Sequence, residues 1–479
     1  MPANSYRELE PLKYILHAVA DTVSEVSLEA PVSSYPGYEG RRRKAAVVSI
    51  AVWSITIALH WVSWGFWLVA GFAGLLCIQA LRVLLARPRQ VVGLLNEPPL
   101  ESPSAVIPES DLPTVSLLVA AKNEEAVIGT LVKMLCSQEY PLDKYEVWVI
   151  DDASTDGTYT VLERLAQEYH QLKILRRSPG ATGGKSGALN QVLPLTKGDI
   201  IAVFDADAQV KPDMLCQLVP MFQPERVGAV QLRKAIANAP LNFWTKGQEV
   251  EMALDAYFQQ QRIAVGGIGE LRGNGQFVRR KALDSCGGWN ELTITDDLDL
   301  TVRLHLDGWD VQFALSPAVQ EEGVTTAIAL WHQRNRWGEG GYQRYLDYWR
   351  LLLGERMGFL KSWDMFGFWV IQYFLPAAAV PDLILSAVKG QPPVMTPLTL
   401  LALTLSFVGM YTGLMRIHCQ DQKPTISTRF EFVGKTLLGI VYMFHWFLIV
   451  ASVSLRISVR PKRLKWVKTV HQGTSSLQF

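Results

Sequence analysis

Charged residues are missing from three long stretches of the chain, and these stretches flank a region of ordinary polarity. Residues 45–81, 392–415 and 436–455 contain no Asp, Glu, Lys or Arg. One crossing of a bilayer needs about 20 apolar residues, so the first stretch is long enough for two helices and each of the others for one. The pattern predicts a transmembrane hairpin over 45–86 and two transmembrane helices within 392–455.

Basic residues at the ends of these stretches predict their orientation, because Lys and Arg are enriched on the cytoplasmic side of membrane helices. Arg41 to Lys44 precede the first stretch, and the segment after residue 455 carries bases but no acid. We therefore expect an N-terminal cytoplasmic tail over 1–44, a basic cytoplasmic tail over 456–479, and a cytoplasmic domain between the two anchors.

The segment 342–391 breaks the simple pattern. Its residues 365–381 are uncharged, but Pro376, Pro381 and Asp382 interrupt the apolar run. An even number of crossings would return the basic C-terminal tail to the cytoplasm, so we expect an interfacial or re-entrant segment here. A fifth transmembrane helix is the alternative.

Residues 113–341 alternate between strand and helix patterns. Apolar runs predict strands over 115–120, 145–150, 173–175 and 200–204, and helical spacing predicts helices over 124–135, 159–168 and 185–193. This alternation predicts an α/β fold with a mostly parallel sheet.

Polar residues follow three of these strands at the point where each strand ends. They are Lys122 to Glu124, Asp151-Asp152, and Asp205 with Asp207. Ligands of parallel sheets bind at the carboxyl ends of the strands. The sequence therefore predicts a ligand site that these residues share.

The pair Asp205-Ala-Asp207 could bind a hard cation. Two carboxylates at a strand end suit Mg²⁺ or Mn²⁺ together with the phosphates of a substrate. A solvated turn is the alternative, because this motif alone is common.

A glycine-rich turn precedes the helix predicted over 185–193. Gly180 to Ser186 resembles a phosphate-binding P-loop but is one residue short, because the first required glycine falls on Pro179. The turn still suits a diphosphate, since backbone N–H groups and the helix dipole attract anions there and Lys185 adds a cation.

Three carboxylates, Asp296, Asp297 and Asp299, precede another helical stretch. Acids at the start of a helix commonly stabilise it as caps or through its dipole. One of them could instead serve as a general base, and both roles are compatible.

The run Gln333 to Trp337 holds two arginines beside a tryptophan. Such a run could anchor the protein at a membrane surface. It could equally place a cation on a departing diphosphate and an indole against a sugar ring.

Composition excludes several classes of protein. The net charge is only +1, which gives no support to nucleic-acid binding, and five dispersed cysteines do not form a disulfide scaffold. We expect reduced thiols and a globular domain attached to membrane segments.

In their order along the chain, these motifs resemble those of the membrane-bound family 2 glycosyltransferases. The resemblance implies the GT-A fold, a Rossmann-like nucleotide-sugar domain, over 113–341. Three stretches, Ala181 to Gln191, Gly266 to Phe277 and Arg460 to Lys468, further resemble the cyanobacterial monoglucosyldiacylglycerol synthases.

The resemblance also implies a role for each motif residue. Asp151 and Asp152 would hold the uracil and ribose end of UDP, and the nucleotide sugar would also be contacted by Glu124, Lys185, Asp205 and Arg336. Asp207 with Asp205 would hold Mg²⁺ or Mn²⁺. Asp297 would be the general base, with Asp296 in place of the usual Glu, and Trp337 with Gln333 would line the acceptor site.

The implied activity is inverting transfer of glucose from UDP-glucose to diacylglycerol in a lipid bilayer, with formation of a β-glucolipid that serves as a galactolipid precursor. The resemblance places such an enzyme in a thylakoid or plasma membrane. A processive polysaccharide synthase of the cellulose or hyaluronan type is the alternative. Against it, the gating motif of cellulose synthases (Phe-x-Val-Thr-x-Lys) is not evident after residue 457.

Overall fold

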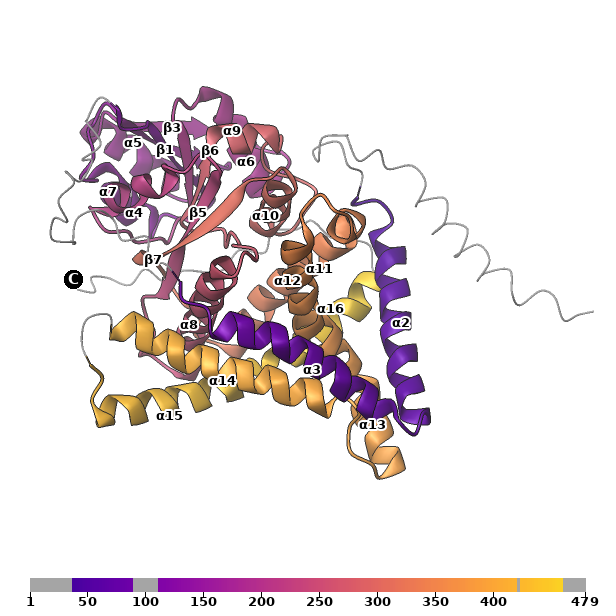
Figure 1. The fold of residues 1–479 in the computed structure, drawn as a ribbon. Coiled ribbons are helices and arrows are strands. Elements are labelled where there is room, and N and C mark those ends of the chain that lie inside the picture. Colours follow the sequence, from indigo (N-terminus) through magenta and orange to yellow (C-terminus); the bar gives the residue numbers. More distant parts are fainter. Residues whose placement is uncertain (1–36, 89–110, 420–422, 460–479) are drawn as a thin grey trace, which may run out of the picture.

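A computed structural model describes residues 37–88, 111–419 and 423–459. Most of the predicted tails 1–44 and 456–479 therefore lies outside the described residues. A sheet domain lies at one end of the molecule, and long apolar helices lie at the other (Figure 1). All five cysteines are free, as the sequence predicts.

The sheet domain contains one seven-stranded sheet of order β3-β2-β1-β4-β6-β5-β7. Its strands are β1 (Val115–Ala121), β2 (Tyr145–Asp151), β3 (Leu172–Arg176), β4 (Ile200–Phe204), β5 (Val227–Ile236), β6 (Gln276–Arg279) and β7 (Asp310–Glu321). Only β6 among the paired strands described runs antiparallel to its neighbours. The predicted α/β fold with a mostly parallel sheet is confirmed.

Helices cover both faces of the sheet, which explains why β1 and β4 are buried along their whole length. Their bounds are α4 (Ile128–Cys136), α5 (Thr158–Glu168), α6 (Gly184–Val192), α7 (Met214–Leu218), α9 (Arg280–Ser285) and α10 (Asp296–Leu306), with short 3₁₀ turns at Leu193–Leu195 and Val219–Phe222. One hydrophobic core lies under α4, α5 and α7, and a second lies under α6, α9 and α10. The helix predicted from residue 124 begins four residues later, at Ile128.

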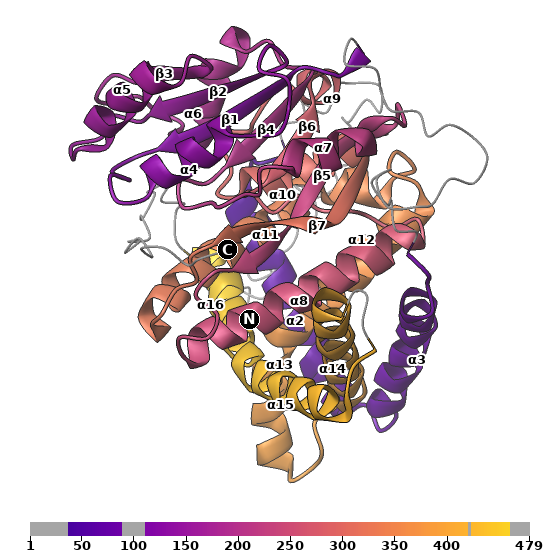
Figure 2. The same ribbon diagram turned by 90° about the vertical axis from the view of Figure 1, so that its left-hand side faces the viewer.

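Two longer helices connect the sheet to the apolar helices. Helix α8 (Phe243–Ala264) lies between β7 and the helices α14 and α15 (Figure 2). Helix α11 (Ala327–Leu353) runs across the domain boundary expected at residue 341. Its tyrosines Tyr342 and Tyr345 are buried in a core shared with the first and last apolar helices.

Among the residues that the structure describes, five helices are long and apolar enough to cross a membrane, by length and composition. They are α2 (Arg41–Trp61), α3 (Gly65–Leu84), α12 to α13 (Phe359–Lys389, with a π-helical turn at Val370–Phe374), α14 (Thr396–His418), and α15 with α16 (Ile426–Met443 and His445–Val459).

Two of these helices differ from the expected spans. The segment expected to be interfacial or re-entrant forms the continuous helix Phe359–Lys389, so its length and composition match the alternative of a fifth transmembrane helix. The span expected over 436–455 straddles the break at Phe444 between α15 and α16. Helix α15 packs on α8 and α14, whereas α16 packs on α2, α11 and α13.

Candidate active site

A cavity of about 1770 Å³ lies at the carboxyl ends of β4, β5 and β7 and extends to α8 and α11. It brings together most of the predicted site residues: Glu124, Lys185, Asp205, Asp207, Asp296, Asp297, Gln333, Arg336 and Trp337 all line it. Because the parallel strands end at one edge of the sheet, residues more than 200 positions apart in the sequence meet there.

Lys185 is the second residue of helix α6 and follows two glycines with positive φ, the N-cap Gly183 (+84°) and the first helical residue Gly184 (+55°). Its Nζ lies 2.5 Å from Asp205 Oδ1. Burial alone would lower the pKa of Lys185, but the carboxylates of Asp205 and Asp296 raise it above its ordinary value. Lys185 is therefore a fixed cation at the N-terminus of a helix, where anions bind favourably.

Asp205 and Asp207 follow β4. Burial would raise the pKa of Asp205, yet Lys185 lowers it, so the carboxylate stays ionised. The backbone N–H of Glu322 donates to Asp207 Oδ2 over 3.2 Å, and that of Asp205 donates to Asn274 Oδ1 over 3.2 Å. These bonds hold two hard oxygen donors at the cavity wall.

Asp297 lies in the first turn of α10, and its carboxylate approaches the turn at Gly273. A Cβ built on Gly273 would lie 3.3 Å from Asp297 Oδ2, and Gly273 itself has φ +82°. Burial and the neighbouring Asp296 raise the pKa of Asp297 to about 6. Such a value suits a general base that works near neutral pH.

Asp299, the third acid of the motif, has a structural role. Its carboxylate accepts bonds from Arg303 Nε (2.7 Å), Tyr348 Oη (2.9 Å) and Asn290 Nδ2 (3.0 Å). It does not line the cavity. The acidic motif therefore divides between the cavity and the protein core, and the N-cap of α10 is Thr295, which makes no side-chain cap hydrogen bond.

The two arginines of the Gln333–Trp337 motif also lie in different places, one in the protein core and one in the cavity wall. Arg334 is buried and pairs with Glu251 over 2.6 Å, which fixes α11 to α8. Arg336 lines the cavity, where burial lowers its pKa while Asp205 and Asp297 oppose that shift. The membrane-anchor interpretation does not fit Trp337, because its ring lies in the cavity wall with Arg334 stacked at 3.9 Å.

Asp151 and Asp152 differ from the other predicted residues. Asp151 is fully buried, and its Oδ1 accepts the N–H of Ser154 over 3.1 Å. Asp152 accepts a 2.6 Å bond from Arg177. Neither aspartate is among the residues that line the cavity, so their assignment to the uracil and ribose stays a prediction.

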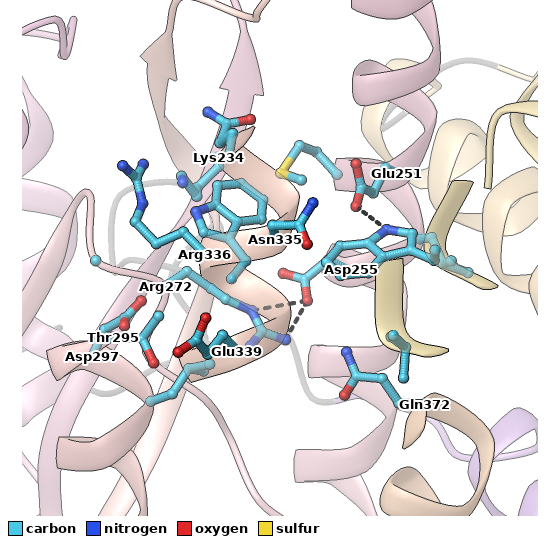
Figure 3. A pocket seen from close by; sticks show the side chains of 18 of the residues that line it. Lys234, Glu251, Asp255, Arg272, Thr295, Asp297, Asn335, Arg336, Glu339 and Gln372 are labelled. Atoms are coloured by element: carbon cyan, nitrogen blue, oxygen red, sulfur yellow. Dashed lines mark hydrogen bonds and ion pairs between the residues drawn. The ribbon is translucent and has the colours of Figure 1, made fainter. Parts of the chain in front are cut away.

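Several polar residues of the site were not predicted. Arg177 joins Asp152 to the carbonyls of Thr182 and Gly184, which ties the glycine-rich turn to the end of β2. Lys234 and Arg272 add cations to the cavity, beside Arg336 and across from Glu251 (Figure 3). The sequence Gly273-Asn-Gly275 could have indicated a tight turn there, because both glycines have positive φ.

Comparisons with known proteins agree with this geometry. The model of the glycosyltransferase-like family 2 matches residues 113–340. A beta-monoglucosyldiacylglycerol synthase from Nostoc sp. is 60% identical over 99% of this chain and 100% of its own length, and one from Synechocystis sp. is 54% identical over 97% and 95%.

A solved structure supports the fold. The structure of a mannosyltransferase from Pyrobaculum calidifontis in complex with GDP-Man and Mn²⁺ has a TM-score of 0.51 at 17% identity, covering 87% of this chain and 99% of that one. The expected GT-A fold is confirmed. The chain belongs to glycosyltransferase family 2 and, within it, to the group of the beta-monoglucosyldiacylglycerol synthases.

Proposed function

We propose that the protein transfers glucose from UDP-glucose to the free hydroxyl of 1,2-diacylglycerol and so forms β-monoglucosyldiacylglycerol. One observation carries this proposal: a single cavity extends from the charged edge of the sheet to apolar side chains of α3, α13 and α14. A nucleotide sugar suits the charged end, and a lipid suits the other. The full-length relatives named for this reaction support the same conclusion.

The donor diphosphate would bind among fixed cations. Lys185 at the N-terminus of α6 and Arg336 on α11 line the same cavity. As the bond between the sugar and UDP breaks, negative charge grows on the departing diphosphate. Preorganised cations in a partly dry site stabilise that charge more than water does.

Asp297 would act as the general base. Its carboxylate takes the proton from the acceptor hydroxyl while that oxygen attacks the anomeric carbon, and UDP leaves with the electron pair of the broken bond. A pKa near 6 leaves the carboxylate largely ionised at neutral pH. One displacement inverts the α-linked donor to a β-glycoside, and it needs no covalent intermediate.

Asp205 and Asp207 would hold Mg²⁺ or Mn²⁺. Their carboxylates are hard oxygen donors at one strand end, which fits either cation. Within the described part of the chain, no group of three or more His, Cys, Asp and Glu side chains is placed to hold a metal. Oxygens of the donor diphosphate and water would therefore complete the coordination. The cation would supply charge neutralisation for the leaving group.

Trp337 and Gln333, which line the cavity, would contact the acceptor in this proposal. In this proposal the enzyme is an integral membrane protein with a cytoplasmic catalytic domain, in a thylakoid or plasma membrane. Polymer synthesis of the cellulose or hyaluronan type is not favoured, because the relatives that match the whole chain are glucolipid synthases.

The test is acceptor dependence. Purified protein receives UDP-glucose or UDP-galactose with Mg²⁺, in vesicles with and without diacylglycerol. We expect a lipid-extractable hexolipid only when diacylglycerol is present, and faster turnover with UDP-glucose. A water-insoluble polymer formed without the lipid would contradict the proposal.

A further inference from the structure

The cavity is too large for the donor alone. Pockets for small molecules commonly have volumes of about 300–1,000 Å³, whereas this cavity has about 1770 Å³. Part of it lies between the apolar helices, whose residues line it. We call this part the apolar limb and define it by six residues that line it: Leu254, Phe258, Ile371, Ala402, Leu405 and Phe444.

Helix α14 borders the limb. It contacts α8 closely at two glycines, where a Cβ on Gly409 would lie 2.6 Å from Leu254 Cδ1 and one on Gly413 would lie 2.2 Å from the Ala253 carbonyl oxygen. The preceding part of α14 instead contributes residues that line the cavity: Thr399, Leu401, Ala402, Leu403, Leu405 and Ser406. The close contacts at the two glycines therefore lie after the part of α14 that borders the cavity.

At the junction between the two parts of the cavity, charged side chains form ion pairs with one another. Asp255 on α8 pairs with Arg272 over 2.6 Å (Figure 3), and Glu251, one turn earlier, pairs with Arg334 over 2.6 Å. A charged headgroup would have to compete with the half-buried Asp255–Arg272 pair and the buried Glu251–Arg334 pair, which is costly. An uncharged glycerol with one hydroxyl would pass without breaking them.

The limb also reaches the apolar outside of the helix bundle. Phe444, at the break between α15 and α16, lines the cavity and is 56% exposed. A side chain that borders both the cavity and the surface marks a place where the two meet. A lipid could therefore enter from the side without leaving an apolar environment.

We infer that the apolar limb is the acyl-chain site of the acceptor, so that diacylglycerol is glucosylated while its tails lie between α8, α12–α13 and α14. This inference rests on the proposed function and deepens it, because the enzyme would bind the acyl chains of the acceptor as well as its hydroxyl. A lipid whose tails stay in the outer bilayer would not bring its hydroxyl as far as Asp297.

Two neighbouring positions of α14 give a matched test in the full-length protein. Ala402 lines the limb, whereas Leu400 is 59% exposed and does not. We expect Ala402→Trp to raise the KM for dioleoylglycerol about tenfold, because the indole fills space that the tails need. The KM for UDP-glucose should not change, short-chain dihexanoylglycerol should be affected less, and Leu400→Trp should leave all three values as in the wild type.

A second measurement does not depend on a variant that folds. Dioleoylglycerol with a photoreactive group near the end of one chain should crosslink the wild type at the cavity-lining residues Leu254, Phe258, Ala402 and Leu405, and unlabelled diacylglycerol should suppress the crosslink.

Equal KM values for the two tryptophan variants, or crosslinks on lipid-facing positions alone, would overturn the inference while leaving the proposed function intact. A wild type that forms no glucolipid would overturn both.

Discussion

Lys185 Nζ lies 2.5 Å from Asp205 Oδ1, and this ion pair joins the glycine-rich turn before α6 to the end of β4. The lysine is thereby held at the charged end of the cavity before any donor binds. Its partner Asp205 is also a proposed cation ligand. When the donor binds, the diphosphate would therefore replace the Asp205 carboxylate as the anion beside Lys185.

Lys185→Ala should weaken UDP-glucose binding by about 10- to 100-fold, because one charged hydrogen bond contributes about 1.5–3 kcal/mol. Titration calorimetry with UDP-glucose and Mg²⁺ measures this change. Lys197→Ala is the matched control, since Lys197 is exposed and does not line the cavity. Equal affinities for the two variants would exclude Lys185 from the donor site.

Asp297→Asn should lower kcat by about 10²–10⁴-fold, the usual contribution of a general base. The amide is nearly isosteric, so the affinity for UDP-glucose should stay within a small factor of the wild type. Single-turnover glucolipid formation measures the first value and calorimetry the second. Turnover close to that of the wild type would remove Asp297 from the mechanism.

The pH dependence should follow the same carboxylate. The raised pKa of Asp297, about 6, means that the base gains its charge as pH rises through 6, so kcat/KM should rise over that interval. Asp296→Asn removes the adjacent negative charge and should move the rise to lower pH. If Asp296→Asn left the pH profile unchanged, a group other than Asp297 would control the rise of kcat/KM with pH.

Gly273→Ala should lower kcat by more than the accompanying loss of folding stability explains. The new Cβ would lie 3.3 Å from Asp297 Oδ2, and alanine at φ +82° costs roughly 1–2 kcal/mol. Gly308→Ala is the control, because Gly308 has φ +83° and a Cβ there meets nothing within 4 Å.

Both alanine variants should lose similar thermal stability, while only Gly273→Ala should lower kcat, by about tenfold or more, through displacement of the base. Thermal unfolding and initial rates separate the two effects. Equal kcat values would mean that the contact with Asp297 has no catalytic consequence.

The sequence predicted best those strands whose pattern is mostly apolar. Strand β4 has the predicted bounds, and β1 and β2, which contain Ser116 and Glu146, extend one residue beyond theirs, because buried parallel strands appear as largely apolar runs. Helix α8 was missed because its buried face carries Glu251, Gln259 and Gln261, whose burial depends on partners from other elements.

Some residues of the candidate site could likewise be predicted from the sequence, and others could not. Lys185, Asp205 and Asp297 could be predicted to meet because each follows or begins a recognisable element at one sheet edge. Arg272 could not, because its place beside the cavity depends on a turn between elements and on pairing with Asp255 on α8. The break at Phe444 also escaped prediction, since the residues on both sides of it are apolar.

The most direct measurement is the anomeric configuration of the lipid product. Purified full-length protein in vesicles that contain diacylglycerol is supplied with UDP-glucose and Mg²⁺, and the extracted product is examined by proton NMR. Single displacement with Asp297 as the base predicts one glucose per diacylglycerol in the β configuration. An α-linked glucolipid, or a glucose polymer with no lipid attached, would contradict this mechanism.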